Sequence, residues 1–324
     1  MTRTVVLDGQ SASDLETAID IIVRGGIVGV PTETVYGLAA DAGNDEALRK
    51  IFDAKGRPES HPLILHVTDV DTARRVANPW PHTAEVLARA FWPGPLTLLV
   101  NRSSDISTVV TGGRDTVAVR VPSHAVFARL LDGLAERGCV GVAAPSANKF
   151  GSVSPTSARH VLADLDGLID AVLDGGECSV GVESTIVDCT LSIPRLLRPG
   201  GVAAESVRAA LVTEGFGFDD NSDGGHKEAI APGMLPSHYA PRARVETFDD
   251  ITELNDRHDQ LVREAVIVQV LPHPDDLYEY SKRLYASLRD CDARGASVIL
   301  ALLPLEEGLG RAIRDRLTKA AADR

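Results

Sequence analysis

Two cations and two histidines cluster around a turn in the stretch Lys55-Gly56-Arg57-Pro58-Glu59-Ser60-His61-Pro62-Leu63-Ile64-Leu65-His66. Lys55 and Arg57 are two residues apart, so in an extended or turn segment both can point at the same anion. Arginine offers a planar fork of donors and lysine a compact charge, a pair suited to polyphosphate. An ordinary solvated loop is the alternative, but the chain carries a formal net charge of −13, so a cationic cluster stands out. The stretch therefore indicates a site for a phosphate-bearing ligand.

Four further segments place polar side chains where a predicted strand meets a loop. They are residues 31–38, 116–122, 143–148 and 181–188 with 197–200. The second carries Arg120 inside an apolar strand, where an unpaired charge is costly, so an anionic partner is expected. Together the segments supply cations for phosphates, several hydroxyl donors and no evident covalent nucleophile. That inventory suits nucleotidyl or phosphoryl chemistry performed by positioning and electrostatics.

Each of these residues alone also has an ordinary structural explanation. Thr34 could close a turn, and His66 could be a core histidine with satisfied hydrogen bonds. Arg120 could pair with a buried carboxylate, and Ser146 could cap a helix. Their combination, rather than any single residue, favours a site.

The elements that must position these residues alternate between strands and helices. A capping box at Ser13 and Glu16 begins a helix that ends at Gly25-Gly26, and residues 27–30 then form a buried strand. Strands are also predicted at 63–67, 96–100, 117–121, 140–144 and 184–187, and helices at 44–55, 83–91, 124–137, 157–165 and 203–213. This alternation, with polar residues at strand ends, predicts an α/β fold with a mixed sheet.

A segment rich in Gly, Asp and Pro, residues 214–243, interrupts the pattern and is predicted to be a linker. The predicted organisation is a first domain at 1–213, the linker, and a second domain at 244–324. In the second domain, strands and helices alternate at 265–271, 277–288, 298–303 and 308–321, which predicts a small parallel sheet. The linker also imitates half of a calcium loop at Asp219, Asn221, Asp223 and Gly224, but its twelfth position is Ile230 instead of glutamate, so no calcium site is predicted.

Composition excludes several classes of protein. The 324 residues, 44% of them apolar, are enough for one large domain or two ordinary ones. The net charge argues against general binding to nucleic acid or anionic membranes. The four cysteines are widely spaced and fit free thiols in a reducing cytosol. The sequence contains no signal sequence and no apolar run of membrane length, so we expect a soluble cytoplasmic protein. It also lacks three common nucleotide and hydrolase motifs: the Gly-x-x-x-x-Gly-Lys-Ser/Thr loop, the Gly-x-Gly-x-x-Gly turn and the Gly-x-Ser-x-Gly elbow.

Five motifs occur in order along the chain. They are Pro-Thr-Glu-Thr-Val-Tyr-Gly-Leu from Pro31, Lys55-x-Arg57 with Ser146-x-Asn148, His66 after Pro62-Leu63-Ile64-Leu65, Glu-Ser-Thr-Ile-Val-Asp from Glu183, and Arg-Pro-Gly from Arg198. Together they resemble the threonylcarbamoyl-AMP synthase family with its YrdC-like domain. The stretches 232–241 and 308–313 resemble the connector and the C-terminal end of the two-domain form.

The resemblance implies a YrdC-like twisted mixed sheet with helices over 1–213 as the catalytic domain, a linker that acts as a lid, and a small Rossmann-like parallel α/β domain over 244–324. It implies that L-threonine, bicarbonate or CO2, and ATP as a substrate give threonylcarbamoyl-AMP and pyrophosphate, with Mg²⁺ accompanying ATP and no metal site of the protein's own. The product would pass to a downstream tRNA threonylcarbamoyl transferase, which modifies the adenosine beside the anticodon. Direct tRNA binding and a membrane are not expected, and a monomer or a dimer would fit.

Residue by residue, the resemblance assigns L-threonine to Thr34, His66, Arg120 and Ser184. It assigns ATP to Arg57, His61, Thr116, Ala144, Ser146, Ser154, Arg198 and Tyr239, and a part in catalysis to Lys55, Arg57, Ser146 and Asn148. Family members usually carry Asn where this chain has His61, and an imidazole can still donate one hydrogen bond there. Asp315 likewise stands where Asn is expected.

Three other functions fit part of the pattern. A carbamoyl-adenylate-forming enzyme of metalloenzyme maturation has a related YrdC-like domain, usually in a longer chain with acylphosphatase-like and zinc-finger segments, and Cys178 and Cys189 are too sparse for such a finger. An RNA-binding module would use the cationic cleft, against the net charge of −13. A small-molecule sensor without turnover would use the same pocket.

The second domain could brace the linker, mediate dimerisation or dock the next enzyme.

Overall fold

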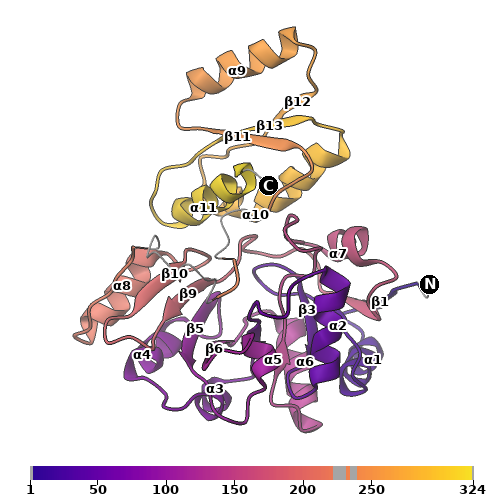
Figure 1. The fold of residues 1–324 in the computed structure, drawn as a ribbon, viewed down its shortest axis with the longest axis vertical. Helices are drawn as coiled ribbons and strands as arrows, with labels where there is room; N and C mark the ends of the chain where they lie inside the picture. Colours follow the sequence, from indigo (N-terminus) through magenta and orange to yellow (C-terminus); the bar gives the residue numbers. More distant parts are fainter. Residues whose placement is uncertain (1–2, 222–230, 234–238, 323–324) are drawn as a thin grey trace.

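A computed structural model describes residues 3–221, 231–233 and 239–322, which form a large α/β unit and a smaller one stacked on it (Figure 1). The large unit is built on a mixed sheet in the order β1-β8-β2-β3-β7-β4-β6-β5-β9-β10. Its strands are β1 (Val5–Asp8), β2 (Val28–Val30), β3 (Gly37–Asp41), β4 (Ile64–His66), β5 (Leu96–Asn101), β6 (Thr116–Arg120), β7 (Val142–Ala143), β8 (Ala171–Asp174), β9 (Thr185–Asp188) and β10 (Arg195–Arg198).

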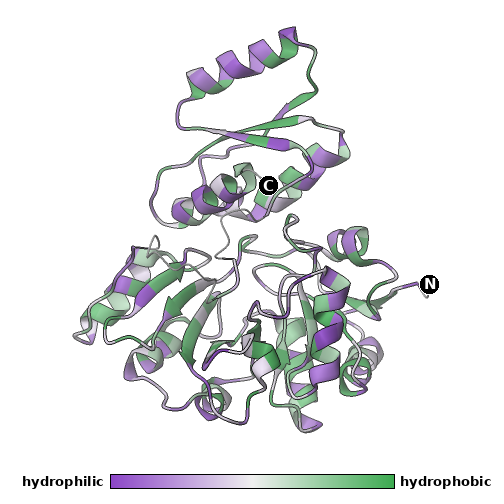
Figure 2. Cartoon of the chain, viewed as in Figure 1, coloured by the Kyte–Doolittle hydropathy of each residue, from purple (hydrophilic) through white to green (hydrophobic). Residues whose placement is uncertain are grey.

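Helices pack against this sheet and leave one stretch of it facing the small unit (Figure 1). They are α1 (Ala12–Val23), α2 (Asp45–Lys55), α3 (Val70–Val76), α4 (His82–Phe91), α5 (Thr108–Thr111), α6 (Ala125–Glu136), α7 (Ala158–Leu165) and α8 (Ala204–Thr213). Figure 2 shows hydrophobic residues gathered on the strands and hydrophilic ones on the outer faces of the helices. The apolar side chains therefore hold the helices to the sheet by burial.

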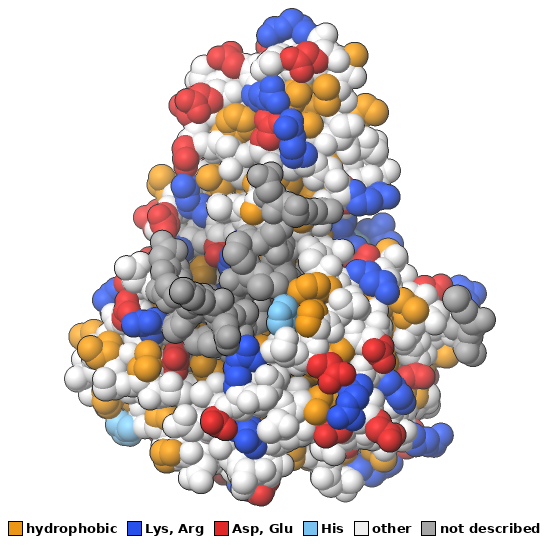
Figure 3. Space-filling model, in the orientation of Figure 1, with side chains coloured by type: hydrophobic (Ala, Val, Ile, Leu, Met, Phe, Trp, Pro, Cys, Tyr) orange, Lys and Arg blue, Asp and Glu red, His pale blue; other side chains and the backbone are white. Residues whose placement is uncertain are grey.

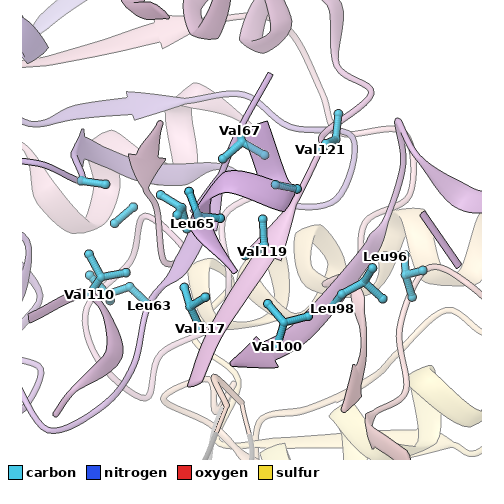
Figure 4. Packing of buried hydrophobic residues seen from close by; sticks show 14 of the residues in the cluster. Leu63, Leu65, Val67, Leu96, Leu98, Val100, Val110, Val117, Val119 and Val121 are labelled. Atoms are coloured by element: carbon cyan, nitrogen blue, oxygen red, sulfur yellow. The ribbon is translucent and has the colours of Figure 1, made fainter. Parts of the chain in front are cut away.

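The alternation of side chains along β4 and β6 places Leu65 and Val119 on one face, and His66 and Arg120 with Ile64 and Ala118 on the other. Leu65 and Val119 belong to the apolar layer shown in Figure 4, together with Val100 of β5. Because successive residues of a strand point to opposite faces, His66 and Arg120 point away from that layer. The two strands are parallel and pair His66 directly with Arg120, so these polar side chains are neighbours on one face.

The small unit is a three-stranded parallel sheet in the order β11-β13-β12 with helices on both faces (Figure 1). Its elements are β11 (Arg244–Phe248), α9 (Ile251–Arg263), β12 (Val268–Val270), α10 (Leu277–Ala293), β13 (Val298–Leu302) and α11 (Leu309–Ala321). Helices α10 and α11 lie on the side toward the large unit, and α9 lies on the far side (Figure 1). None of the helices within 3–221 and 239–322 is long and apolar enough to cross a membrane.

The predicted fold class, a mixed-sheet α/β unit plus a small parallel one, is confirmed. The structure adds five strands and three helices to the prediction: β1, β3, β8, β10 and β11, and α3, α5 and α9. The strand predicted at 140–144 is shorter, at Val142–Ala143. Within the predicted linker, Phe218 is buried and Asp219 pairs with Arg195, so its first residues pack on the large unit. Of the calcium-like loop, Asp223, Gly224 and Ile230 lie outside the described residues.

Candidate active site

A cavity opens on the sheet face that carries His66 and Arg120, where β4 and β6 meet the loop after β2, and its empty space together with the solvent at its mouth is about 540 Å³. Its described lining includes nine of the residues predicted for a site. They are Thr34, Arg57, His66, Arg120, Ala144, Ser146, Ser184, Arg198 and Tyr239. Segments that are distant in the sequence thus converge here because the strand order brings their ends to one face.

The loop between β2 and β3 forms one wall around the Arg120 guanidinium. Its Nη1 donates to Thr34 Oγ1 at 3.0 Å, and its Nε donates to the Gly94 carbonyl at 3.2 Å. Nη2 lies 2.8 Å from Oε1 of Glu33, and both side chains are almost fully buried. The alternative explanation for Arg120, pairing with a buried carboxylate, is therefore observed. It coexists with a place in the cavity lining, where the cation is still within reach of a ligand.

His66 lies beside Arg120 in the cavity wall and stays neutral there. Complete burial, and then the positive charge of Arg120, lower its pKa to about 3. Glu33 behaves differently: its burial raises the pKa of the carboxyl, but Arg120 outweighs that effect and the net shift is downward. At neutral pH this end of the cavity therefore combines an ionised Arg–Glu pair with an uncharged imidazole and the hydroxyls of Thr34 and Ser184.

The other end of the cavity is cationic. Arg198 donates from Nε and Nη2 to the Ser184 carbonyl at 3.0 and 2.8 Å, and from Nη2 to Ser184 Oγ at 3.0 Å. Arg57 is held by Nη2 on the Pro62 carbonyl at 3.0 Å and lies over the Phe150 ring. Burial lowers the pKa of Arg57 to about 10, so it remains protonated at neutral pH. Two buried arginines facing one space supply the positive charge that binding of a polyanion requires.

Lys55 lies behind this wall instead of in it. Its Nζ donates to the carbonyl oxygens of Ser146 and Asn148 at 2.5 and 2.6 Å, and the side chain is 2% exposed. Burial, and then the nearby Arg57, hold the pKa of the Lys55 ammonium well below its usual range. The residue thus anchors the turn that presents Ser146, and it is not among the residues that line the cavity.

Four more predicted site residues lie outside the described lining. Asn148 Nδ2 donates to the Lys149 and Ser152 carbonyls, both at 2.8 Å, and Ser154 Oγ donates to Glu183 Oε1 at 2.7 Å. The other two are half-buried: His61, whose ring lies 5.4 Å from that of Phe150, and Thr116, which begins β6 at the end opposite Arg120. The roles assigned to these four residues stay predictions.

Sequence reasoning missed the acidic partners of the site. Glu33 and Glu183 both lie inside recognised motifs, next to Thr34 and Ser184, yet neither was assigned a role. Glu183 is the one carboxylate among the described residues lining the cavity, and Arg316 of α11 pairs with it. A glutamate directly before a predicted binding serine was a signal, but its partner lies 133 residues away and could not be read from local patterns.

The donor groups of the described cavity do not suit Mg²⁺. Among the described residues, no cluster of His, Cys, Asp or Glu could hold a metal ion. Glu183 is occupied by Arg316 and Tyr285, and the remaining charged lining groups are cations. On the face shown in Figure 3, acidic and basic side chains are interspersed, whereas the arginines that line the cavity are buried.

Comparisons with known proteins match nearly the whole chain. A family model described as telomere recombination (Sua5/YciO/YrdC) matches residues 20–200, and a model described as threonylcarbamoyl-AMP synthase, C-terminal domain, matches residues 202–322. The threonylcarbamoyl-AMP synthase of Pyrococcus abyssi is 39% identical, over 96% of this chain and 94% of that protein. That of Bacillus subtilis is 37% identical, over 98% and 96%.

The structural comparison agrees with the sequence matches. The crystal structure of P. abyssi Sua5 complexed with L-threonine has a TM-score of 0.89 and 39% sequence identity, and the match covers 99% of this chain and 98% of that one. The similarity therefore extends over both units and their arrangement.

Proposed function

The chain belongs to the threonylcarbamoyl-AMP synthase family, an enzyme family of nucleotidyltransferase type, and from that premise we propose that it converts L-threonine, bicarbonate or CO2, and ATP into threonylcarbamoyl-AMP and pyrophosphate. The observation that carries the proposal is the composition of the cavity, where one end offers Arg120 with hydroxyls and the other offers Arg57 and Arg198. An amino acid and a triphosphate need those two kinds of subsite side by side.

The first subsite is proposed to hold L-threonine. The guanidinium of Arg120 would take the α-carboxylate, since it already has hydrogen-bonding neighbours that fix its plane. Thr34 and Ser184 would supply hydroxyls, and neutral His66 would supply one uncharged ring donor or acceptor. The complex of P. abyssi Sua5 with L-threonine supports this choice of amino acid.

The second subsite is proposed to hold the phosphates of ATP. Arg57 and Arg198 would offset the negative charge that builds up on the phosphorus-bound oxygens during the reaction. Ser146, presented by the turn that Lys55 anchors, would add a hydroxyl. Mg²⁺ is expected to arrive with ATP, because the described residues do not form a site for it.

The proposed chemistry needs no nucleophile from the protein. The threonine amine attacks CO2 and loses a proton to solvent, which gives a carbamate. A carbamate oxygen then attacks the α-phosphorus of ATP, the new oxygen–phosphorus bond forms, and the bond to the β-phosphate oxygen breaks with release of pyrophosphate. The protein contributes the alignment of the two substrates and the charge of its arginines.

Water must be kept from the carbamate, which reverts readily. The described part of the linker contributes Pro232, Gly233 and Tyr239 to the cavity lining. Gly233 has a φ of +81°, and a Cβ at this position would lie 2.4 Å from Tyr239 Oη, so only glycine fits there. We propose that this segment closes the site as a lid. Its remaining part, with His238, lies outside the described residues.

The product is proposed to serve threonylcarbamoyladenosine modification of tRNA through a separate downstream transferase, with the enzyme working in the cytoplasm. Pyrophosphate release from ATP, with L-threonine and bicarbonate each omitted in turn, tests the reaction. The proposal expects release only when both are present. Release without L-threonine would overturn the amino-acid assignment and favour a carbamoyl-adenylate-forming or ATP-hydrolysing activity.

A further inference from the structure

We propose that Tyr285 and Arg316, both in the small C-terminal unit, are positioning residues for the active site and act through the carboxylate of Glu183. The inference rests on the proposed function, because it concerns the binding of L-threonine and ATP at the same cavity. It gives the C-terminal unit a specific part in the reaction that its fold alone does not reveal.

The Glu183 carboxylate is held from both units at once. Arg316 Nε lies 2.7 Å from Oε2, and Tyr285 Oη donates toward Oε2 at 2.8 Å and Oε1 at 3.1 Å. Ser154, from the large unit, donates to Oε1 at 2.7 Å. The Arg316 side chain is 0% exposed and that of Glu183 is 8% exposed. A buried carboxylate with four such contacts is fixed in position.

Glu183 lies directly before Ser184, whose backbone and hydroxyl bind Arg198. Its own carbonyl accepts a hydrogen bond from the Gly201 amide at 3.0 Å, which joins it to the segment after Arg198. Arg316 reaches that second segment as well, since its Nη2 donates to the Pro199 carbonyl at 3.0 Å. One side chain of α11 therefore fixes the two segments that carry Ser184 and Arg198.

The same helix also touches the lid segment. Lys319, three residues after Arg316, donates from Nζ to the Gly233 carbonyl at 2.8 Å. The Arg316 guanidinium lies 4.9 Å from the centre of the Tyr239 ring, and Tyr285 stacks on that ring at 5.8 Å. Three parts of the cavity lining thus depend on one face of the C-terminal unit.

The ionisation states suit a permanent anchor. Burial raises the pKa of Glu183, but the charges of Arg316 and Arg198 outweigh it, and the net pKa is about 2. Burial also holds the pKa of Tyr285 well above its usual value, so its hydroxyl remains a donor. Around neutral pH, Glu183 and Arg316 are therefore ionised and Tyr285 is protonated.

A purely structural contact between the units would stabilise the protein without affecting substrate affinity, so the test needs two matched tyrosines. Tyr285→Phe removes the hydroxyl that donates to Glu183. Tyr280→Phe, in the same helix, removes a hydroxyl that donates to the Leu302 carbonyl at 2.9 Å inside the C-terminal unit. Both side chains are buried, at 0% and 2% exposure, and the change is chemically identical.

The experiment measures the thermal midpoint and the KM values for L-threonine and ATP by pyrophosphate release. We expect Y285F to raise at least one KM about five- to tenfold, while Y280F stays within about twofold of wild type despite a comparable loss of midpoint. Equal KM values in the two variants would overturn the positioning role. A wild-type enzyme that releases no threonine-dependent pyrophosphate would instead overturn the proposed function, and this inference with it.

Arg316 provides a second, graded test. Arg316→Met removes the charge, and Arg316→Lys keeps it but cannot reach Glu183 and Pro199 together. We expect the KM of R316K to lie between wild type and R316M. If R316M does not fold, R316K is compared with wild type and should still show a raised KM. A wild-type KM in R316K would contradict the positioning role of the Arg316 guanidinium, which contacts both Glu183 and Pro199.

Discussion

Glu33→Gln should make the protein less stable and, at the same time, bind L-threonine more tightly. In the free protein, Glu33 neutralises Arg120 at 2.8 Å, and both side chains are nearly fully buried. An amide keeps the shape of the side chain but leaves the Arg120 charge uncompensated. The guanidinium stays oriented, because Thr34 and the Gly94 carbonyl still accept its Nη1 and Nε hydrogens.

The magnitude follows from the burial of the pair. Removing one partner of a buried ion pair costs about 3–5 kcal/mol. An unfolding entropy of about 2.1 cal/mol/K per residue gives roughly 0.7 kcal/mol/K for 324 residues, so the midpoint should fall by about 4–7 °C if the chain unfolds as one unit. The threonine carboxylate can then supply the missing charge. A charge-assisted hydrogen bond of about 1.5–3 kcal/mol corresponds to a roughly ten- to hundredfold lower Kd.

Differential scanning fluorimetry and titration calorimetry with L-threonine measure both effects. Asp164→Asn is the matched control, because it breaks the partly buried pair with Arg289 at 2.6 Å, away from this cavity. The control should lose stability with an unchanged Kd. If E33Q kept the wild-type midpoint, or bound L-threonine no more tightly, the reasoning that Glu33 and the substrate carboxylate share Arg120 would be refuted.

Three further changes probe the parts around the site. Lys55→Met leaves two buried carbonyls without their donor, so urea unfolding should show a loss of about 2–5 kcal/mol, and an unchanged midpoint would contradict the anchoring role. Burial and the charge of Arg120 lower the pKa of His66 to about 3, so the free energy of unfolding should fall by up to ~1.4 kcal/mol for each pH unit below 6.5. His66→Gln should show a smaller fall, and the same pH dependence in both proteins would contradict the neutral buried imidazole. Gly181 has a φ of +81°, and a Cβ there would lie 2.4 Å from the backbone of α10, whereas Gly215 has a φ of +84° and open space around it. Gly181→Ala should therefore lower the thermal midpoint more than Gly215→Ala, and equal decreases would contradict a steric clash with α10.

Local sequence patterns were enough to predict much of the fold and part of the candidate site. The short apolar runs at 63–67 and 117–121 were enough to expect strands, and the parallel register found in the structure makes His66 and Arg120 neighbours. Helix α3 was missed because seven residues leave little room for a helical period, and α9 was missed despite its 13 residues because it buries only Leu254 and Leu261.

The remainder depends on contacts that no local pattern encodes. Lys55 was predicted as a phosphate ligand from its spacing to Arg57, but its ammonium is instead directed to carbonyls of a turn more than 90 residues away. The partner of Glu183 lies in another unit of the chain. The predicted domain limits at 213 and 243 also stay predictions, and the matched C-terminal family model begins at residue 202, before α8.

The central claim is that the enzyme joins a carbon from bicarbonate to both threonine and AMP. Incubating it with ¹³C-bicarbonate, L-threonine and ATP, followed by mass spectrometry of the nucleotide products, tests that claim directly. We expect threonylcarbamoyl-AMP one mass unit heavier than the product from unlabelled bicarbonate, and none when L-threonine is replaced by glycine. AMP or ADP alone, or a carbamoyl-AMP without threonine, would contradict it.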